Sequence, residues 1–200
     1  MRFISSSFAG KGLAIALATF MLAACSAAPK RDADRFYGLN VEAIQQSYGS
    51  TAQIEVRPVT IKGVQSGRPL VIQESAAPLQ LVESRGHFWH SQPAYLIQDA
   101  TIEALNQGTT DARFGTSDTL KMVDYRLRLT ATQFSYMPSS HAMVAITMSL
   151  QTRSGEVITA GNYEAKAELT SDAPADATAA FGTAMEMILT DMAADIAEAL

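Results

Sequence analysis

Three consecutive segments between residues 125 and 169 alternate apolar with polar side chains. A period of two places every second side chain on the same face of a β-strand. Three such strands in succession predict an antiparallel sheet whose apolar face must be covered by another layer. The apolar positions are Tyr125, Leu127, Leu129 and Ala131 in the first segment, Val144, Ile146, Met148 and Leu150 in the second, and Tyr163, Ala165, Ala167 and Leu169 in the third.

Two helices are predicted to supply the covering layer. The first begins with Ser91 as N-cap and Pro93 in its first turn, and it ends near Asn106. The second follows Pro174, and its apolar side chains recur at helical spacing. We therefore expect an α+β fold, in which two helices pack on one face of an antiparallel or mixed sheet in a single domain. The stripe of the second helix is Phe181, Met185, Ile188, Met192 and Ile196.

The segments before this core predict shorter strands. Residues 35–39 form a first apolar cluster. Ile54 and Val56 share one side of an extended segment, and Pro58 indicates that this segment lies at the edge of a sheet or at a bulge. Residues 62–69 form a loop, and residues 70–72 and 78–82 are extended, the latter ending at a turn at Gly86. In the first long strand, Phe134 and Tyr136 fall on the opposite parity to Leu129, which predicts a bulge near Gln133.

The N-terminal segment predicts export and lipid anchoring. Positive charges at Arg2 and Lys11 precede an apolar run over residues 12–23, which is too short to span a bilayer. Leu22-Ala23-Ala24-Cys25 is similar to a bacterial lipobox, so cleavage between Ala24 and Cys25 removes residues 1–24 and leaves a lipid on Cys25. Two or three acyl chains give a stable anchor, because each buried CH2 contributes about 0.8 kcal/mol. The alternatives are a free core cysteine or an ordinary signal cleaved elsewhere.

The mature chain is expected to be one domain on a tether. Residues 25–34 are small, polar and proline-bearing, and residues 35–200 form the domain. Removing the two positive charges of the signal from the net charge of −5 leaves about −7, which argues against nucleic acid as a partner. Ser26 follows Cys25 where an aspartate resembles an inner-membrane retention signal, so the resemblance favours the periplasmic face of the outer membrane.

The sequence carries no motif that assigns a catalytic or metal site. His87 and His90 are three residues apart and His141 is distant, whereas a zinc site needs three or four ligands. We interpret the first two as polar residues flanking Trp89, which we expect to be buried. No nucleophile elbow, metalloprotease motif or dinucleotide-binding spacing occurs, and we expect neither a cofactor nor enzymatic activity.

Several short motifs in a fixed order resemble the ABC-type transport auxiliary lipoprotein family, which includes the paraquat-inducible protein C-like lipoproteins. Residues 62–64 and 75–77 depart from the family pattern, which leaves the loop geometry there open. The matching residues are Tyr37-x-Leu39, Ile54-x-Val56-x-Pro58-Val59, Gly67-Arg68-Pro69-Leu70-Val71, Trp89 and Pro93 leading into Leu96-Ile97 and Ala104-Leu105, Asp124-Tyr125-Arg126-Leu127 with Phe134, and Ala180-Phe181.

This resemblance implies a periplasmic lipoprotein that works beside an ABC transporter and a mammalian-cell-entry (MCE) domain protein to move lipids or other apolar molecules. It supplies no catalytic residues. The alternatives are an envelope lipoprotein that assembles or activates another machine, such as a cell-wall synthase, and a hydrolase with an unrecognised site.

Residues for structure and for contact are also predicted. Trp89 and Phe181 are expected to be structural. The polar face of the sheet, which carries Arg126 and Arg128, is expected to be solvated. Partner contact or self-association is assigned instead to an exposed edge and the loop that follows it, because unpaired backbone groups accept a further strand. The candidate contact residues are Ile54, Val56, Lys62 and Arg68.

Overall fold

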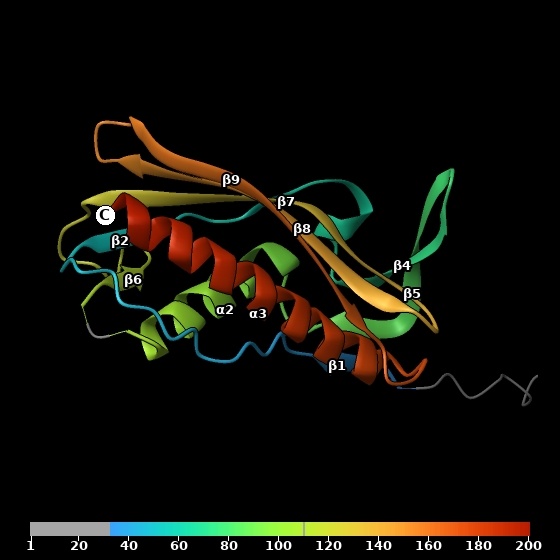
Figure 1. The fold of residues 1–200 in the computed structure, drawn as a ribbon. Coiled ribbons are helices and arrows are strands. Elements are labelled where there is room, and N and C mark those ends of the chain that lie inside the picture. Colours follow the sequence, from blue (N-terminus) through green and yellow to red (C-terminus); the bar gives the residue numbers. More distant parts are fainter. Residues whose placement is uncertain (1–32, 110) are drawn as a thin grey trace, which may run out of the picture. The chain divides into compact units, whose positions relative to one another are not determined.

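The strand β7 (Tyr125–Met137) is the centre of the sheet (Figure 1). The computed structural model describes residues 33–109 and 111–200, and Asp34–Leu200 form one compact unit. The remaining elements are β1 (Arg35–Tyr37), β2 (Gln53–Val56), β3 (Thr60–Ile61), the 3-10 helix η1 (Gly63–Ser66), β4 (Pro69–Ala76), β5 (Leu79–Trp89), α2 (Pro93–Gln107), β6 (Arg113–Gly115), β8 (His141–Thr152), β9 (Val157–Glu168) and α3 (Pro174–Ala199).

The two edges of β7 pair in different ways. One edge pairs antiparallel with β8, and β8 pairs antiparallel with β9. The other edge is shared along its length by β2, β3 and β4, which all run parallel to β7. From there the sheet continues through β6 beside β2, and through β5 and β1 beside β4. The sheet of the described residues is therefore mixed, and β7, β8 and β9 form the predicted succession of three antiparallel strands.

The predicted alternation is confirmed in β8, and in β7 a bulge interrupts it. Val144, Ile146 and Met148 are at most 1% exposed. The β7–β8 register shifts between Ala131 and Gln133, which returns the next aromatic residues to the buried face. The predicted bulge is therefore confirmed.

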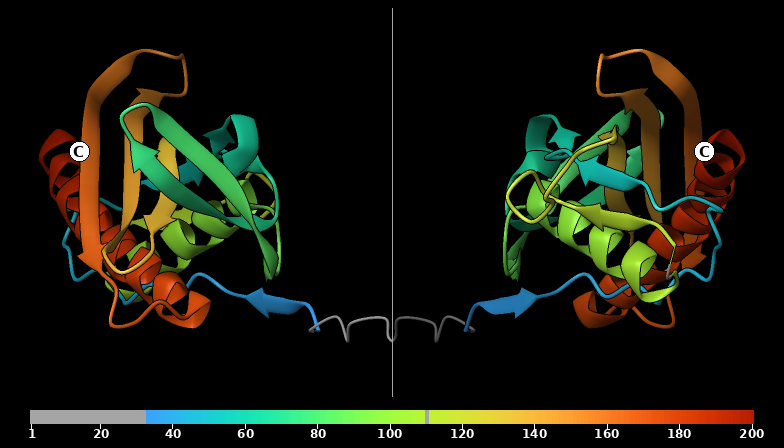
Figure 2. Two further views of the ribbon diagram at one scale, coloured as in Figure 1. Left: turned by 90° about the vertical axis from the view of Figure 1, so that its right-hand side faces the viewer. Right: turned by 90° about the vertical axis from the view of Figure 1, so that its left-hand side faces the viewer.

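Both helices lie on the same side of the sheet (Figures 1 and 2). The apolar stripe of α3 is buried as predicted, with Phe181 and Ile196 fully inaccessible, and it packs against β8 and β9. The helix α2 begins at Pro93, but its N-cap is Gln92 and no side chain caps it, so the prediction of Ser91 as N-cap is wrong. Within the described residues no helix has the length and apolar character needed to cross a membrane.

An aromatic cluster fills the space between α3 and the sheet. Trp89 is 1% exposed, and its ring centroid lies 5.3 Å from that of Phe134 and 5.4 Å from that of Phe181. Phe134 and Phe181 are 4.5 Å apart, and Tyr136 lies edge-on to Phe181. The structure thus places Trp89 and Phe181 at the centre of the core.

Residues 38–52, which we call the strap, connect β1 to β2 without regular secondary structure and run along the helices (Figure 1). The backbone N–H of Ile44 donates to the carbonyl of Ala104 in the last turn of α2 at 2.9 Å. Two glycines permit close approach of the strap. A Cβ at Gly108 would lie 1.7 Å from the Ile44 carbonyl oxygen, and one at Gly182 would lie 2.1 Å from that of Asn40.

Several predicted boundaries are corrected. The strand β2 has β7 on one side and β6 on the other, so the prediction that it is an exposed edge is wrong. Pro58 lies between β2 and β3 and therefore removes no hydrogen bond from either. β5 continues through Gly86, which adopts a φ of +74°, instead of ending there. The predicted loop at residues 62–69 contains η1, and β6 was not predicted.

Candidate functional site

The predicted contact residues separate into buried and exposed ones. Ile54 is 0% and Val56 1% exposed, and both belong to the core, so neither is available to a partner. Lys62 is exposed at the start of η1, and Arg68 is exposed between η1 and β4. Cys25 and Ala24 lie outside the described residues.

Arg68 is held at the junction of β1, β4 and β5. Its Nε donates to the carbonyl of Trp89 and its Nη2 to that of His90, both at 3.1 Å. The guanidinium carbon lies 5.2 Å from the ring centroid of Phe36, within the range of a cation–π interaction. These contacts fix a cation on the surface beside an aromatic ring.

Phe36 is the exposed part of this junction. Its side chain is 57% exposed and stacks on Phe88 with ring centroids 5.8 Å apart, because the two residues are register partners in β1 and β5. Arginine and aromatic side chains are enriched in protein interfaces. We call Phe36, Arg68 and Phe88 the Arg68–Phe36 surface. The sequence identified Arg68 but missed Phe36, because the three residues of β1 form too short a pattern to define the faces of the strand.

The histidines make separate contacts. The Nδ1 atom of His87 lies 2.9 Å from the Tyr37 hydroxyl, and that of His141 lies 2.7 Å from the Ser140 hydroxyl. Among residues 33–109 and 111–200, no group of three or more His, Cys, Asp or Glu side chains is placed to hold a metal ion.

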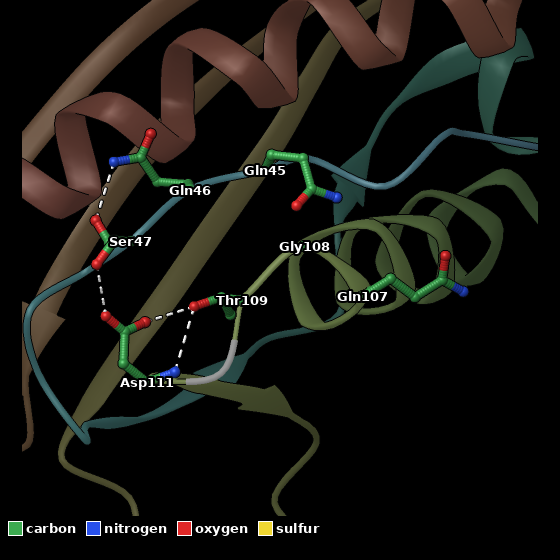
Figure 3. Close-up of a pocket in the computed structure, with 7 residues that line it drawn as sticks. All are labelled: Gln45, Gln46, Ser47, Gln107, Gly108, Thr109 and Asp111. Atoms are coloured by element: carbon green, nitrogen blue, oxygen red, sulfur yellow. Dashed lines mark hydrogen bonds between the residues drawn. The ribbon is translucent and has the colours of Figure 1, made fainter.

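A pocket of about 400 Å³ lies between the strap and the connection from α2 to β6 (Figure 3). Its carboxylate, Asp111, accepts hydrogen bonds from Ser47 Oγ at 2.8 Å, from the backbone N–H of Tyr48 at 3.0 Å and of Gly49 at 2.9 Å, and from Thr109 Oγ1. The hydroxyls of Thr109 and Ser47 hold the pKa of the Asp111 carboxyl well below its usual range. Because this carboxylate is already satisfied by four donors of the chain, we assign the pocket a structural role.

The tyrosine beside this carboxylate is part of the core. Tyr48 is 3% exposed and lies edge-on to Phe114, with ring centroids 5.2 Å apart. Burial, and then the charge of Asp111, raise the pKa of its hydroxyl. Tyr48 therefore anchors the strap, and Asp111 fixes the backbone N–H groups of Tyr48 and Gly49 and the hydroxyl of Ser47.

The polar face of the sheet contains a buried carboxylate that the sequence analysis missed. Glu55 is 5% exposed, and it receives Arg57 Nη1 on Oε1 at 3.0 Å and Arg126 Nε on Oε2 at 3.2 Å. Glu55 and Arg126 are register partners in β2 and β7. Glu55 follows Ile54 in an extended segment, and this alternation indicates that the two side chains lie on opposite faces of the strand. No local pattern links Glu55 with Arg126, which lies 71 positions later in the chain.

The fold is a single α+β domain in which two helices cover one face of a mixed sheet. Over residues 37–197 the sequence matches the model of the ABC-type transport auxiliary lipoprotein component. The chain belongs to this family, which confirms the resemblance. No curated protein matches the chain.

Solved structures agree with the fold. A crystal structure of an uncharacterized protein has a TM-score of 0.70 at 13% identity and covers 82% of this chain and 99% of its own. A DUF330 protein from Xanthomonas campestris has a TM-score of 0.69 at 14% identity, covering 82% of this chain and 96% of its own. At these identities the likeness concerns the fold alone.

Proposed function

We propose that this chain is a lipid-anchored component on the periplasmic face of the envelope that assists an ABC transporter and an MCE-domain protein in moving lipids or other apolar compounds. The observation that carries the proposal is the family match over residues 37–197, because the family is defined as an auxiliary component of ABC-type transport. The lipobox-like segment ending at Cys25 supports anchoring, and Ser26 supports the outer membrane. The role is non-catalytic in this proposal.

The Arg68–Phe36 surface is the partner contact that we propose. Binding energy in interfaces is concentrated in a few aromatic and arginine side chains that become desolvated. Phe36 offers such a ring, and Arg68 is already fixed by two backbone carbonyls, so little side-chain entropy is lost when a partner binds. Lys62 is the other exposed cation of the predicted contact segment, just before η1.

Affinity capture of the lipidated protein from solubilised membranes tests the proposal. We expect an ABC transporter and an MCE-domain protein among the captured proteins, in amounts that fall for Phe36→Ala. The matched control is Tyr95→Ala, because Tyr95 is similarly exposed at 50% but lies on α2. Capture of a cell-wall synthase in place of transport proteins would support the alternative assembly role, and hydrolysis of a substrate from an activity screen would contradict the non-catalytic role.

A further inference from the structure

A pocket of about 530 Å³ opens beside the buried Glu55, and positive charge dominates its lining. Its lining residues come mainly from the segment between β6 and β7 and from the ends of the strands beside it, with Arg153 from the turn between β8 and β9. This segment and this turn lie at the same end of the domain (Figure 1). The side chains that the following argument uses are Glu55, Arg57, Lys121, Met122, Arg126 and Arg153.

The charge of this pocket is opposite to that of the chain. Four cationic side chains and one carboxylate give the pocket a formal charge of +3, whereas the whole chain carries −5. A cavity lined by one sign of charge concentrates the field and attracts ions of the other sign. Asp124 lines the adjoining cavity, but its Oδ2 already accepts the backbone N–H of Gln53 at 2.9 Å.

Glu55 holds two of the cations in place without using all of their donors. Arg57 bonds to it through Nη1 only. Arg126 uses Nε for Glu55 and Nη1 for the Arg153 carbonyl at 3.0 Å, which also fixes the β8–β9 turn. A guanidinium carries five N–H donors, so each arginine keeps donors that have no acceptor among the described residues. The side chain of Arg126 is partly exposed at 35%, and that of Arg57 is exposed at 48%.

The other two cations are exposed and not paired. Within residues 33–109 and 111–200, neither Lys121 nor Arg153 has an acidic partner within 4.0 Å. Arginine groups bind phosphate oxygens with parallel charge-assisted hydrogen bonds, and lysine adds a point charge. A pocket of this volume is larger than a phosphate group needs, so it also has room for the organic part of a ligand.

We infer that this pocket binds a phosphate group carried by an organic molecule, with Arg57 and Arg126 as preoriented donors and Lys121 and Arg153 closing around the anion. Met122, which is 54% exposed, lies at the same pocket and offers apolar contact to that molecule. A lipid headgroup and a soluble phosphate ester share this chemistry. The inference does not depend on the transport role proposed above.

Calorimetric titration of the mature protein in a neutral detergent, at constant ionic strength, tests the site with three probes. These are inorganic phosphate, glycerol 3-phosphate, and dihexanoyl phosphatidic acid, which adds two short acyl chains to the second probe. We expect saturable binding that the double variant Lys121→Ala/Arg153→Ala weakens by about tenfold or more, because two charge-assisted contacts are lost. The matched control Lys166→Ala/Arg85→Ala removes the same charges from exposed positions outside the pocket and should bind like the parent.

The probes also distinguish the two sources of phosphate. Tighter binding of the dihexanoyl lipid than of glycerol 3-phosphate, lost in the double variant, supports a lipid headgroup and an apolar contribution. Equal affinities support a soluble phosphate ester in the same pocket. The inference is overturned if chloride at the same ionic strength competes as well as phosphate, or if the double variant retains parental affinity while its circular dichroism spectrum is unchanged.

Discussion

At the scale of single residues, burial separates side chains that determine stability from those available for contact. Trp89 and Phe36 are both aromatic and lie at opposite extremes, at 1% and 57% exposed. The sequence predicted Trp89 as a core residue, because a single large indole next to a helix start has much apolar area to bury. It did not identify Phe36, because a three-residue strand has too short a pattern to define its faces.

Replacing Trp89 by alanine is expected to destabilise the domain by about 3 to 5 kcal/mol, because the cavity would remove contacts with Phe134 and Phe181. Equilibrium unfolding in denaturant measures the change. The control Phe36→Ala should unfold near the parental midpoint. Parental stability of the tryptophan variant together with loss of partner capture would show that Trp89 is a contact residue.

Asp111 gives the domain a pH-dependent contribution to stability. Its pKa is depressed in the folded state by the hydroxyls of Thr109 and Ser47, so its carboxylate stabilises the fold above the ordinary aspartate range near 4. That contribution is lost as the pH falls through the folded pKa. We therefore expect Asp111→Asn to be less stable than the parent at pH 7, and the difference to shrink as the pH falls below about 4.

Unfolding free energies of both proteins between pH 7 and pH 3 check this expectation. Asp118→Asn is the matched control, since Asp118 is exposed in the next connection of the chain and its only side-chain hydrogen bond within the described residues is a long one, 3.4 Å from Ser117. A difference between Asp111→Asn and the parent that stays constant over this pH range would contradict the assignment.

At the scale of elements, the strap shows how irregular backbone is fixed by its neighbours. It satisfies its backbone groups partly with carbonyls of α2, as in the bond from Gln46 to Gly108 at 3.3 Å. Its carbonyl at Asn40 lies against α3 where Gly182 has no side chain. A helix interior ordinarily favours alanine over glycine by about 1 kcal/mol, so glycine at position 182 serves packing.

Gly182→Ala is expected to destabilise the domain despite the better helix propensity of alanine. The new Cβ would lie 2.1 Å from the Asn40 carbonyl oxygen, a contact with backbone at the severe end of overpacking, where the cost of about 3 kcal/mol exceeds the propensity gain of about 1 kcal/mol. Thermal unfolding measures the effect, with Thr183→Ala at the exposed neighbouring position as the control. A higher midpoint for Gly182→Ala than for the parent would show that the strap moves away freely.

At the scale of the whole molecule, the compact unit of residues 34–200 contains its own core, whereas we propose that Cys25 attaches the chain to a membrane. Both helices, all described strands and the aromatic cluster belong to this unit. The fold of the domain and its attachment to a membrane are therefore expected to be separable properties.

Cys25→Ala is expected to leave the domain folded and to release the protein from membranes, because only the acyl chains would supply membrane affinity. Fractionation of cells that express the variant or the parent measures the release, and circular dichroism of the variant checks the fold. Membrane association of the variant that persists through washing would contradict the anchor.

The sequence by itself determined the local character of most elements. The alternation of β7, β8 and β9 and the stripe of α3 are properties of neighbouring residues, so the α+β class and the bulge near Gln133 were predictable. Partly exposed charged residues and strands of three residues show no periodic pattern of this kind. The short strand β6 and the exposed face of β1 were therefore missed, and the N-cap of α2 was placed one residue too early.

Only the tertiary structure decided which strands become neighbours. Pro58 suggested an edge, yet β2 is interior, because the proline falls after the strand ends and leaves its backbone groups free to pair on both sides. The same parallel pairing brings Glu55 beside Arg126 and assembles a cationic pocket on an acidic chain. Contacts between residues 71 positions apart depend on how the sheet closes, which no local pattern encodes.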